Sequence, residues 1–160
     1  MLIKTGIGYD IHRLVEGRKL FLGALEIPYG RGLLGHSDGD VLLHAICDAL
    51  LGALALGDIG EHFPDTDPKY KGISSVKLLE IVRKLVAENN FRINNLDTVV
   101  IAEEPLLSAF KKPMQQKIAA LLKIPEDAVN IKAKTNEGLG ALGAKEAIAS
   151  YAIATISRGE

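Results

Sequence analysis

Three residues in the first third of the chain have the types and spacing of a divalent-metal site. Asp10 and His12 stand two positions apart at the end of a glycine-containing apolar segment, and side chains at i and i+2 of a strand point to the same side. His44 lies in an apolar segment with helical spacing. Two imidazoles and one carboxylate suit zinc, and three protein ligands leave one position open for substrate.

His44 by itself has a plainer interpretation, as a chance histidine on a solvated helix face. Asp40 and Asp48 lie four positions before and after it and share its side of the helix. Either carboxylate is a candidate for orienting His44 from outside the ligand set. Cys47 lies three residues after His44, and a small buried thiol is the favoured interpretation over a metal ligand.

The remaining histidines have different predicted roles. Ser37 is expected to cap a helix, and His36 directly precedes it. Backbone N–H groups at a helix start attract anions, so His36 is predicted to donate to phosphate. His62 belongs to an acidic loop, and we interpret it as an exposed loop histidine.

Two polar segments add candidate phosphate and sugar contacts. Thr135 can donate to a phosphate oxygen, Lys134 can neutralise one, and Glu137 can hold a hard cation beside them. The same residues fit ordinary polar positions at a strand end. Residues 58–67 carry four carboxylates, which suit polyol hydroxyls but are also common in turns.

The elements that must position these residues alternate between strands and helices. Strands are expected at 2–9, 20–27, 96–102 and 129–133, and helices from Ser37 to a stop at Gly57, at 75–89 and at 108–123. Residues 58–71 are expected to form a loop, and residues 147–156 fit helix or strand equally. This alternation predicts an α/β layer structure in a single domain, residues 1–160.

Composition excludes several classes of protein. The chain has 160 residues, 48% apolar, with a net charge of −1 and no basic run, so nucleic acid is not an expected partner. The single cysteine excludes an internal disulfide and fits a reducing compartment. Neither a signal peptide nor a membrane span of about 18 apolar residues is recognisable. We therefore expect a cytoplasmic protein with no targeting segment and no membrane partner.

Five motifs, taken in order, resemble those of the 2-C-methyl-D-erythritol 2,4-cyclodiphosphate synthase family. They are GYDIH at 8–12, HSDGD at 36–40, GDIG at 57–60, FPDTD at 63–67 and KAKTNE at 132–137. The resemblance covers nearly the whole chain, and several motifs together are more specific than one metal pair. It implies a metal-dependent lyase of the non-mevalonate isoprenoid pathway. The 2-phosphate of 4-diphosphocytidyl-2-C-methyl-D-erythritol 2-phosphate would attack its own β-phosphorus and release CMP.

The resemblance also implies roles for individual residues. Zinc would be held by Asp10, His12 and His44, and magnesium or manganese by Glu137, while His36 and Thr135 would stabilise the transition state. The implied substrate-binding residues are Asp10, His12, His36, Ser37, Asp58, Gly60, Phe63, Asp65, Asp67, Ala102, Pro105, Leu106, Leu107, Ser108, Lys134, Thr135, Asn136 and Glu137.

The implied fold is α/β (α+β-like), with a single-layer mixed β-sheet and helices packed on one face. This sheet favours a strand for the tail. Members of the family are homotrimers with sites shared between subunits. The chain departs from the family at Leu106, where many members have lysine, and at Ala141 and Ala144, where many have an aromatic residue and arginine. Two alternatives remain open: a zinc hydrolase acting on a phosphate ester, and a non-enzymatic trimer that needs metal for assembly or binds isoprenoids.

Overall fold

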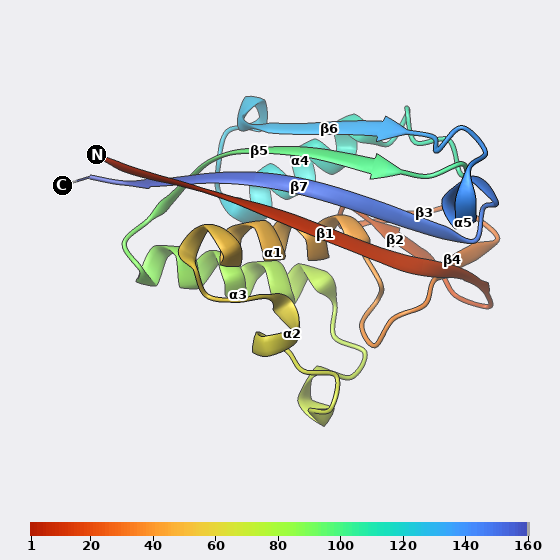
Figure 1. The fold of residues 1–160 in the computed structure, drawn as a ribbon, viewed down its shortest axis with the longest axis horizontal. Coiled ribbons are helices and arrows are strands. Elements are labelled where there is room, and N and C mark those ends of the chain that lie inside the picture. Colours follow the sequence, from red (N-terminus) through yellow and green to blue (C-terminus); the bar gives the residue numbers. More distant parts are fainter. Residues whose placement is uncertain (160) are drawn as a thin grey trace.

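A mixed sheet of five strands, in the order β4-β1-β7-β5-β6, forms the body of the computed structural model, which describes residues 1–159 (Figure 1). The strands are β1 (Leu2–Glu16), β4 (Arg31–Leu33), β5 (Arg92–Ile101), β6 (Val129–Lys134) and β7 (Ala147–Arg158). β5 and β6 run parallel, and the other neighbouring strands are antiparallel. A separate hairpin pairs β2 (Leu20–Leu22) with β3 (Leu25–Ile27).

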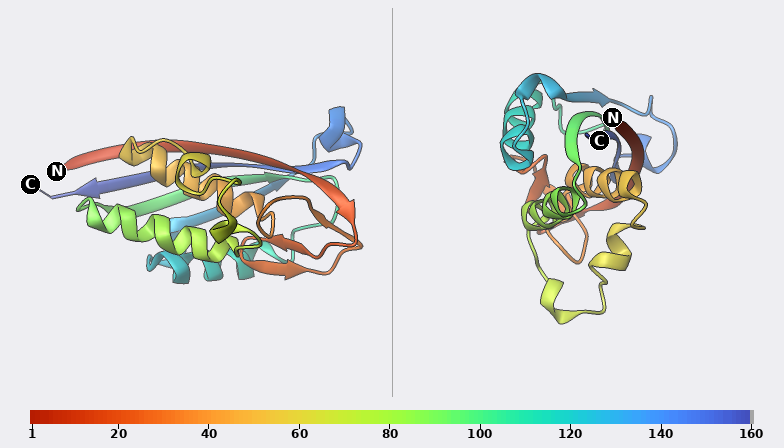
Figure 2. Two further views of the ribbon diagram at one scale, coloured as in Figure 1. Left: turned by 90° about the horizontal axis from the view of Figure 1, so that it is seen from below. Right: turned by 90° about the vertical axis from the view of Figure 1, so that its left-hand side faces the viewer.

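Three long helices cover one face of this sheet (Figure 2). They are α1 (Val41–Leu54), α3 (Ser75–Glu88) and α4 (Lys111–Leu122). The shorter helices are α2 (Ile59–His62), α5 (Gly140–Gly143), and the 3₁₀ turns η1 (Pro68–Tyr70) and η2 (Glu126–Ala128). The expected mixed sheet with helices on one face is therefore confirmed. No helix among residues 1–159 has the length and apolar character needed to cross a membrane.

The helix α1 packs against β1 at unusually short range because β1 has glycines on the covered side. A Cβ atom at Gly6 would collide with the carbonyl oxygen of Ala49, and one at Gly8 with that of Ala45. Since side chains alternate along a strand, Asp10 and His12 face the same helix as these glycines. The close approach brings the side chain of His44 over this part of β1.

The start of α1 differs from the sequence expectation. Its N-cap is Asp40 rather than Ser37, and the Asp40 carboxylate accepts from the backbone N–H of Leu43 at 3.1 Å. The same carboxylate accepts from Gly23 and Ala24 in the β2–β3 turn. Asp40 therefore fixes the helix start and the hairpin together. His36 consequently lies in the loop before the helix, and its expected place at the helix N-terminus is wrong.

Several other boundaries also differ. The expected strand 20–27 is a hairpin that turns at Gly23-Ala24. α1 ends at Leu54 instead of at Gly57, and its C-cap is Ala55 in the left-handed conformation (φ 61°). The expected loop 58–71 contains α2 and η1, and the third helix begins at Lys111, not Ser108. The ambiguous tail is the central strand β7, paired on both sides.

On the face of the sheet opposite the helices, the part formed by β1 and β7 is largely apolar and exposed. The outward positions of β1 alternate with the inward glycines, and Tyr9 stacks on Tyr151 of β7 with ring centroids 4.6 Å apart. Ile7, which pairs with Ile153, is 68% exposed. The large exposed apolar side chains at the outward positions of these two strands are Ile3, Ile7, Tyr9, Ile11, Tyr151 and Ile153. An apolar face of this kind is typical of an interaction surface.

Candidate metal and phosphate site

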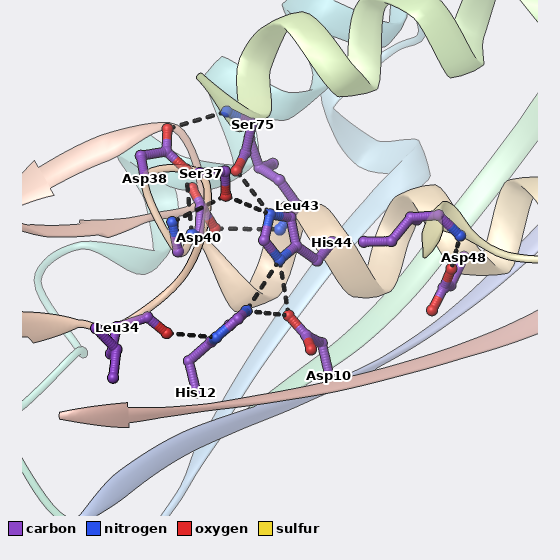
Figure 3. A network of polar contacts seen from close by, with 12 residues as sticks. Asp10, His12, Leu34, Ser37, Asp38, Asp40, Leu43, His44, Asp48 and Ser75 are labelled. Atoms are coloured by element: carbon purple, nitrogen blue, oxygen red, sulfur yellow. Dashed lines mark hydrogen bonds and ion pairs between the residues drawn. The ribbon is translucent and has the colours of Figure 1, made fainter. Parts of the chain in front are cut away.

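Asp10, His12 and His44 meet between β1 and the first turn of α1 (Figure 3). Asp10 Oδ2 lies 2.8 Å from His44 Nδ1 and 3.0 Å from His12 Nε2, and the two imidazole nitrogens are 3.2 Å apart. Three ligand atoms bound to zinc at about 2.0 Å in tetrahedral geometry stand about 3.3 Å from one another. The cluster therefore needs to open by only a few tenths of an ångström to hold such an ion.

The ionisation of Asp10 favours a bound cation. Burial acts to raise the pKa of Asp10, but hydrogen bonds and charge from His12 and His44 outweigh it and hold this pKa far below its usual range. Burial acts to lower the pKa of His12, yet Asp10 outweighs that effect and raises it. A carboxylate that stays ionised in a half-buried position is suited to a metal ion.

Each histidine has its second ring nitrogen held by another group (Figure 3). His12 Nδ1 donates to the carbonyl oxygen of Leu34 at 2.7 Å. His44 Nε2 lies 2.9 Å from Ser75 Oγ and 3.1 Å from Ser37 Oγ. These partners leave His12 Nε2 and His44 Nδ1 facing the cluster, which is the arrangement that metal-binding histidines need.

Neither of the two carboxylates that were candidates for orienting His44 is hydrogen-bonded to its ring among the described residues. The Asp40 carboxylate accepts hydrogen bonds from the first turn of α1 and from the β2–β3 turn. Asp48 accepts from the backbone N–H of Ile59 at 2.8 Å, and so holds the start of α2 (Figure 3). The sequence prediction fails because i±4 spacing places residues on one side of a helix without joining their side chains. Cys47 is fully buried, which confirms its interpretation as a buried thiol.

The cluster of Asp10, His12 and His44, called the metal cluster below, lies in the wall of a pocket of about 410 Å³. The lining includes the cluster itself, His36 and Ser37, together with residues of the segment after α1. His36 Nε2 is buried and has no hydrogen-bond partner among residues 1–159. Buried polar atoms are nearly always paired in folded proteins, so this nitrogen fits a ligand group that enters the pocket. His62 is half-buried and hydrogen-bonds the carbonyl of Leu56, away from the cluster.

The acidic segment after α1 supplies only part of its predicted residues to this pocket. Gly60, Phe63 and Asp65 line it. Asp58 caps α2 by accepting from Glu61 N, and Asp67 caps η1 by accepting from Lys69 N. Turn chemistry therefore explains the carboxylates of Asp58 and Asp67 in this structure.

A second pocket, of about 160 Å³, shares no lining residue with the first. The predicted nucleotide-side residues that line it are Ala102, Pro105, Leu106, Leu107, Ser108, Lys134 and Thr135. Thr135 Oγ1 donates to Glu137 Oε1 at 3.1 Å. Asn136 and Glu137 continue the loop beside this pocket. Within one chain, Thr135 and Glu137 are thus associated with the second pocket and not with the metal cluster.

Two residues that organise these sites were missed by sequence reasoning. Ser75 contacts His44, but in the sequence it reads as an ordinary serine at a helix start. Glu103 accepts from Asn136 N at 2.7 Å and from Gly138 N at 3.2 Å, and so holds the loop of Thr135 and Glu137. No local pattern signals either role, because both partners lie more than 30 positions away.

Comparison with known proteins gives relatives along nearly the whole chain. The model of the YgbB family matches residues 3–157. A protein of Clostridium botulinum (strain Eklund 17B / Type B) named 2-C-methyl-D-erythritol 2,4-cyclodiphosphate synthase is 58% identical over 154 residues, covering 96% of this chain and 98% of the relative. One of the same name from Desulforamulus reducens is 57% identical over 157 residues, covering 98% of this chain and 100% of the relative.

Solved structures of similar proteins agree with the fold. The bifunctional IspDF of Campylobacter jejuni superposes with a TM-score of 0.95 at 43% identity and covers 99% of this chain, while the chain spans 43% of that longer protein. A 2C-methyl-D-erythritol-2,4-cyclodiphosphate synthase in its CDP-bound form superposes with a TM-score of 0.89 at 38% identity, covering 96% of this chain and 100% of that one.

Proposed function

The chain belongs to the YgbB family, the 2-C-methyl-D-erythritol 2,4-cyclodiphosphate synthases, and from that membership we propose how its residues carry out the family's reaction. It is a lyase that converts 4-diphosphocytidyl-2-C-methyl-D-erythritol 2-phosphate to the 2,4-cyclodiphosphate and CMP in isoprenoid precursor synthesis. A 2-phosphate oxygen forms a bond to the β-phosphorus as the bond to the CMP oxygen breaks. No protein nucleophile takes part.

The observation that carries the proposed mechanism is the cluster of Asp10, His12 and His44 in the wall of the larger pocket. We assign this cluster to zinc, because two imidazoles and one carboxylate at nearly tetrahedral spacing match its preferences. Bound there, zinc would supply a positive charge that fixes and polarises a phosphate group of the substrate. The polar residues next to the cluster then act on the same phosphate.

His36 and Ser37 are proposed to hold the phosphate beside the metal cluster. Both line the pocket, and His36 Nε2 is a buried nitrogen with no partner among residues 1–159. A donor fixed at this point can stabilise the charge that develops on the phosphate oxygens during attack. Gly60, Phe63 and Asp65 line the same pocket and are proposed to hold the methylerythritol part. Holding both reacting groups in line is the main catalytic task of such a site.

The second pocket is proposed to bind the cytidine part of the substrate. It is lined by the 102–108 segment, and a similar synthase has been solved in a CDP-bound form. Thr135 and Glu137 stand at its edge, joined by a hydrogen bond. We propose that Glu137 holds magnesium or manganese at the diphosphate, and that Thr135 contacts the transferred phosphate. Lys134, Asn136, Asp58 and Asp67 stay predicted substrate contacts.

Assembly as a homotrimer with shared sites is part of the proposal. The two pockets have no residue in common, so a substrate that needs both is best served if a neighbouring subunit brings its second pocket to the first. The exposed apolar face of β1 and β7 is a surface that such an assembly would cover. A single catalytic domain over residues 1–160 and a cytoplasmic location complete the proposal.

The direct test is product identification with the defined substrate. Purified protein supplied with zinc and magnesium is expected to release CMP and the cyclic diphosphate in equal amounts. Asp10→Ala should abolish both, whereas Asp127→Ala, at the far η2 turn, should not. Release of inorganic phosphate or a linear product would instead support a hydrolase, and absence of CMP would contradict the mechanism.

A further inference from the structure

We propose that Ser75, supported by Asp38, is a positioning residue that sets the tautomer and orientation of His44 for metal binding. The inference rests on the metal site proposed above and adds two residues from outside the ligand set. Ser75 is the first residue of α3, 31 positions after His44. It ties the end of the segment that lines the pocket to the metal cluster.

The hydroxyl of Ser75 lies between the Asp38 carboxylate, which can only accept a hydrogen bond, and the Nε2 atom of His44 (Figure 3). Ser75 Oγ forms a short hydrogen bond to Asp38 Oδ1, while Asp38 Oδ2 accepts from the backbone N–H of Ser75 at 3.0 Å. A carboxylate is an acceptor only, so the Ser75 hydroxyl proton points to Asp38. The lone pairs of Ser75 Oγ are then left for His44 Nε2, 2.9 Å away.

This arrangement fixes the proton of the His44 ring. An oxygen whose own proton is already donated can only accept, so Nε2 must carry the hydrogen. With Nε2 protonated, Nδ1 is the ring nitrogen left to bind the ion, and it lies 2.8 Å from Asp10 Oδ2 and 3.2 Å from His12 Nε2. A hydrogen held between Nδ1 and the Asp10 carboxylate leaves when the cation binds. The hydrogen bonds from Asp38 through Ser75 to His44 therefore leave Nδ1 as the nitrogen that faces the metal position.

Ser37 and Ser75 both approach His44 Nε2, but their surroundings differ. Ser37 lines the pocket and also accepts from Gly39 N at 3.1 Å, so its hydroxyl proton is free for a substrate phosphate. Ser75 is fully buried and does not line the pocket. We therefore assign the orientation of His44 to Ser75 and substrate contact to Ser37.

Zinc affinity of the purified, metal-stripped chain, measured by competition with a chromogenic chelator, tests this assignment. Ser75→Ala is expected to weaken zinc binding about 10- to 100-fold, the range typical of such outer partners. The matched control is Ser74→Ala. Ser74 caps α3 by accepting from Val76 N at 3.3 Å, so its loss affects the helix alone and should leave zinc affinity unchanged.

Asp38→Asn is the second variant, in case Ser75→Ala folds poorly, since it keeps the Ser75 hydroxyl and should weaken zinc binding in the same direction. Nitrogen-edited NMR of the zinc-loaded wild-type protein gives a direct readout: His44 should carry its proton on Nε2. A proton on Nδ1 would overturn both the proposal and the assignment of Nδ1 as the ligand atom. Wild-type zinc affinity in both variants would overturn the proposal while leaving the metal site intact. If the wild-type chain fails to bind zinc, the proposed metal site fails as well.

Discussion

At the residue scale, the candidate metal site of Asp10, His12 and His44 is held in shape by hydrogen bonds to groups outside the ligand set. His12 is fixed by a backbone carbonyl and His44 by Ser75, and each imidazole then meets Asp10 with a defined nitrogen. A site prepared in this way loses little side-chain freedom when the ion binds. The carboxylate is the one ligand that brings a negative charge.

Asp10 should therefore be the most sensitive ligand. Asp10→Ala removes the charge that offsets the cation, and the purified variant is expected to contain less than about a tenth of the wild-type zinc. The measurement is metal analysis after dialysis against a weak chelator. Full zinc retention would remove Asp10 from the ligand set. Asp48→Ala, on the same side of α1 but bonded to Ile59, serves as the control and should retain zinc.

Cys47 gives a second prediction at this scale. Burial raises the pKa of its thiol well above the usual value, and the side chain has no exposed surface. The thiolate is the reactive form, so a thiol reagent should modify the folded protein roughly 100-fold more slowly than the unfolded one. Rapid modification of the native chain would show that α1 opens readily.

The residue-scale outcome also shows what spacing can predict. Asp10 and His12 were predicted because strand periodicity places i and i+2 together, and the structure joins them with His44. Ser75 and Glu103 could not be found in this way. Their roles arise from contacts between elements distant in sequence, and nothing in a serine or glutamate at those positions distinguishes them beforehand.

At the element scale, the candidate metal site depends on how closely α1 approaches β1. Gly8→Ala would place a Cβ against the carbonyl of Ala45 and push the helix outward. We expect the free energy of unfolding to fall by about 1–3 kcal/mol, with weaker zinc binding because His44 moves away from Asp10. Denaturant unfolding and chelator competition measure the two effects.

Gly30→Ala is the matched control for that prediction, since a Cβ there meets open space and the backbone is not left-handed. It should leave both quantities unchanged. If Gly8→Ala behaved like Gly30→Ala, close helix packing would not be what places His44.

Asp48 connects two elements, α1 and α2, and we expect it to make the stability of the fold depend on pH. Burial raises its pKa despite the hydrogen bond from Ile59 N, and the charges of Asp58 and Asp10 add to the rise. The folded chain thus binds this proton more tightly than the unfolded chain. Its contribution favours the fold below the unfolded pKa of about 3.9 and is lost as the pH rises through the folded pKa.

Asp48→Asn keeps an acceptor for Ile59 and removes the charge. The metal-free variant should therefore unfold roughly 1–3 °C higher than wild type at neutral pH. Calorimetry at neutral pH and near pH 4 checks the sign, because the difference should shrink in acid. A difference that grows as the pH falls would contradict the raised pKa.

Element boundaries were predicted less well than element types. Ser37 and Asp40 are both good capping residues, and Asp40 is the cap because its carboxylate also satisfies Gly23 and Ala24. That hairpin is a tertiary contact, which local pattern cannot contain. The tail carries both helix-favouring and strand-favouring residues, and pairing with β1 and β5 on either side makes it a strand.

At the scale of the whole molecule, the chain has two separate pockets and an uncovered apolar surface. The pocket with the metal cluster and the pocket beside Thr135 share no residue. The uncovered face of β1 and β7 is apolar along much of its length. In the proposed homotrimer, other copies of the chain cover that face and bury its apolar side chains, and the second pocket of one copy meets the first pocket of another.

Ile7 lies at the centre of this exposed face and gives the decisive test. Ile7→Lys places a charge where the proposed assembly would exclude water, so the variant is expected to be monomeric by light scattering and the wild type trimeric. The metal cluster lies within one chain, so zinc content should be retained. CMP release should nevertheless be lost, because each site would lack its neighbour's contribution.

Ile81→Lys is the control for the same change of side chain on the helical side of the molecule. Ile81 is an exposed isoleucine of α3, and the variant should keep both trimer and activity. A trimeric Ile7→Lys protein would move the interface away from this face. A monomer that still releases CMP at the wild-type rate would mean that one chain holds the complete site, and that the two pockets serve the substrate without a neighbour.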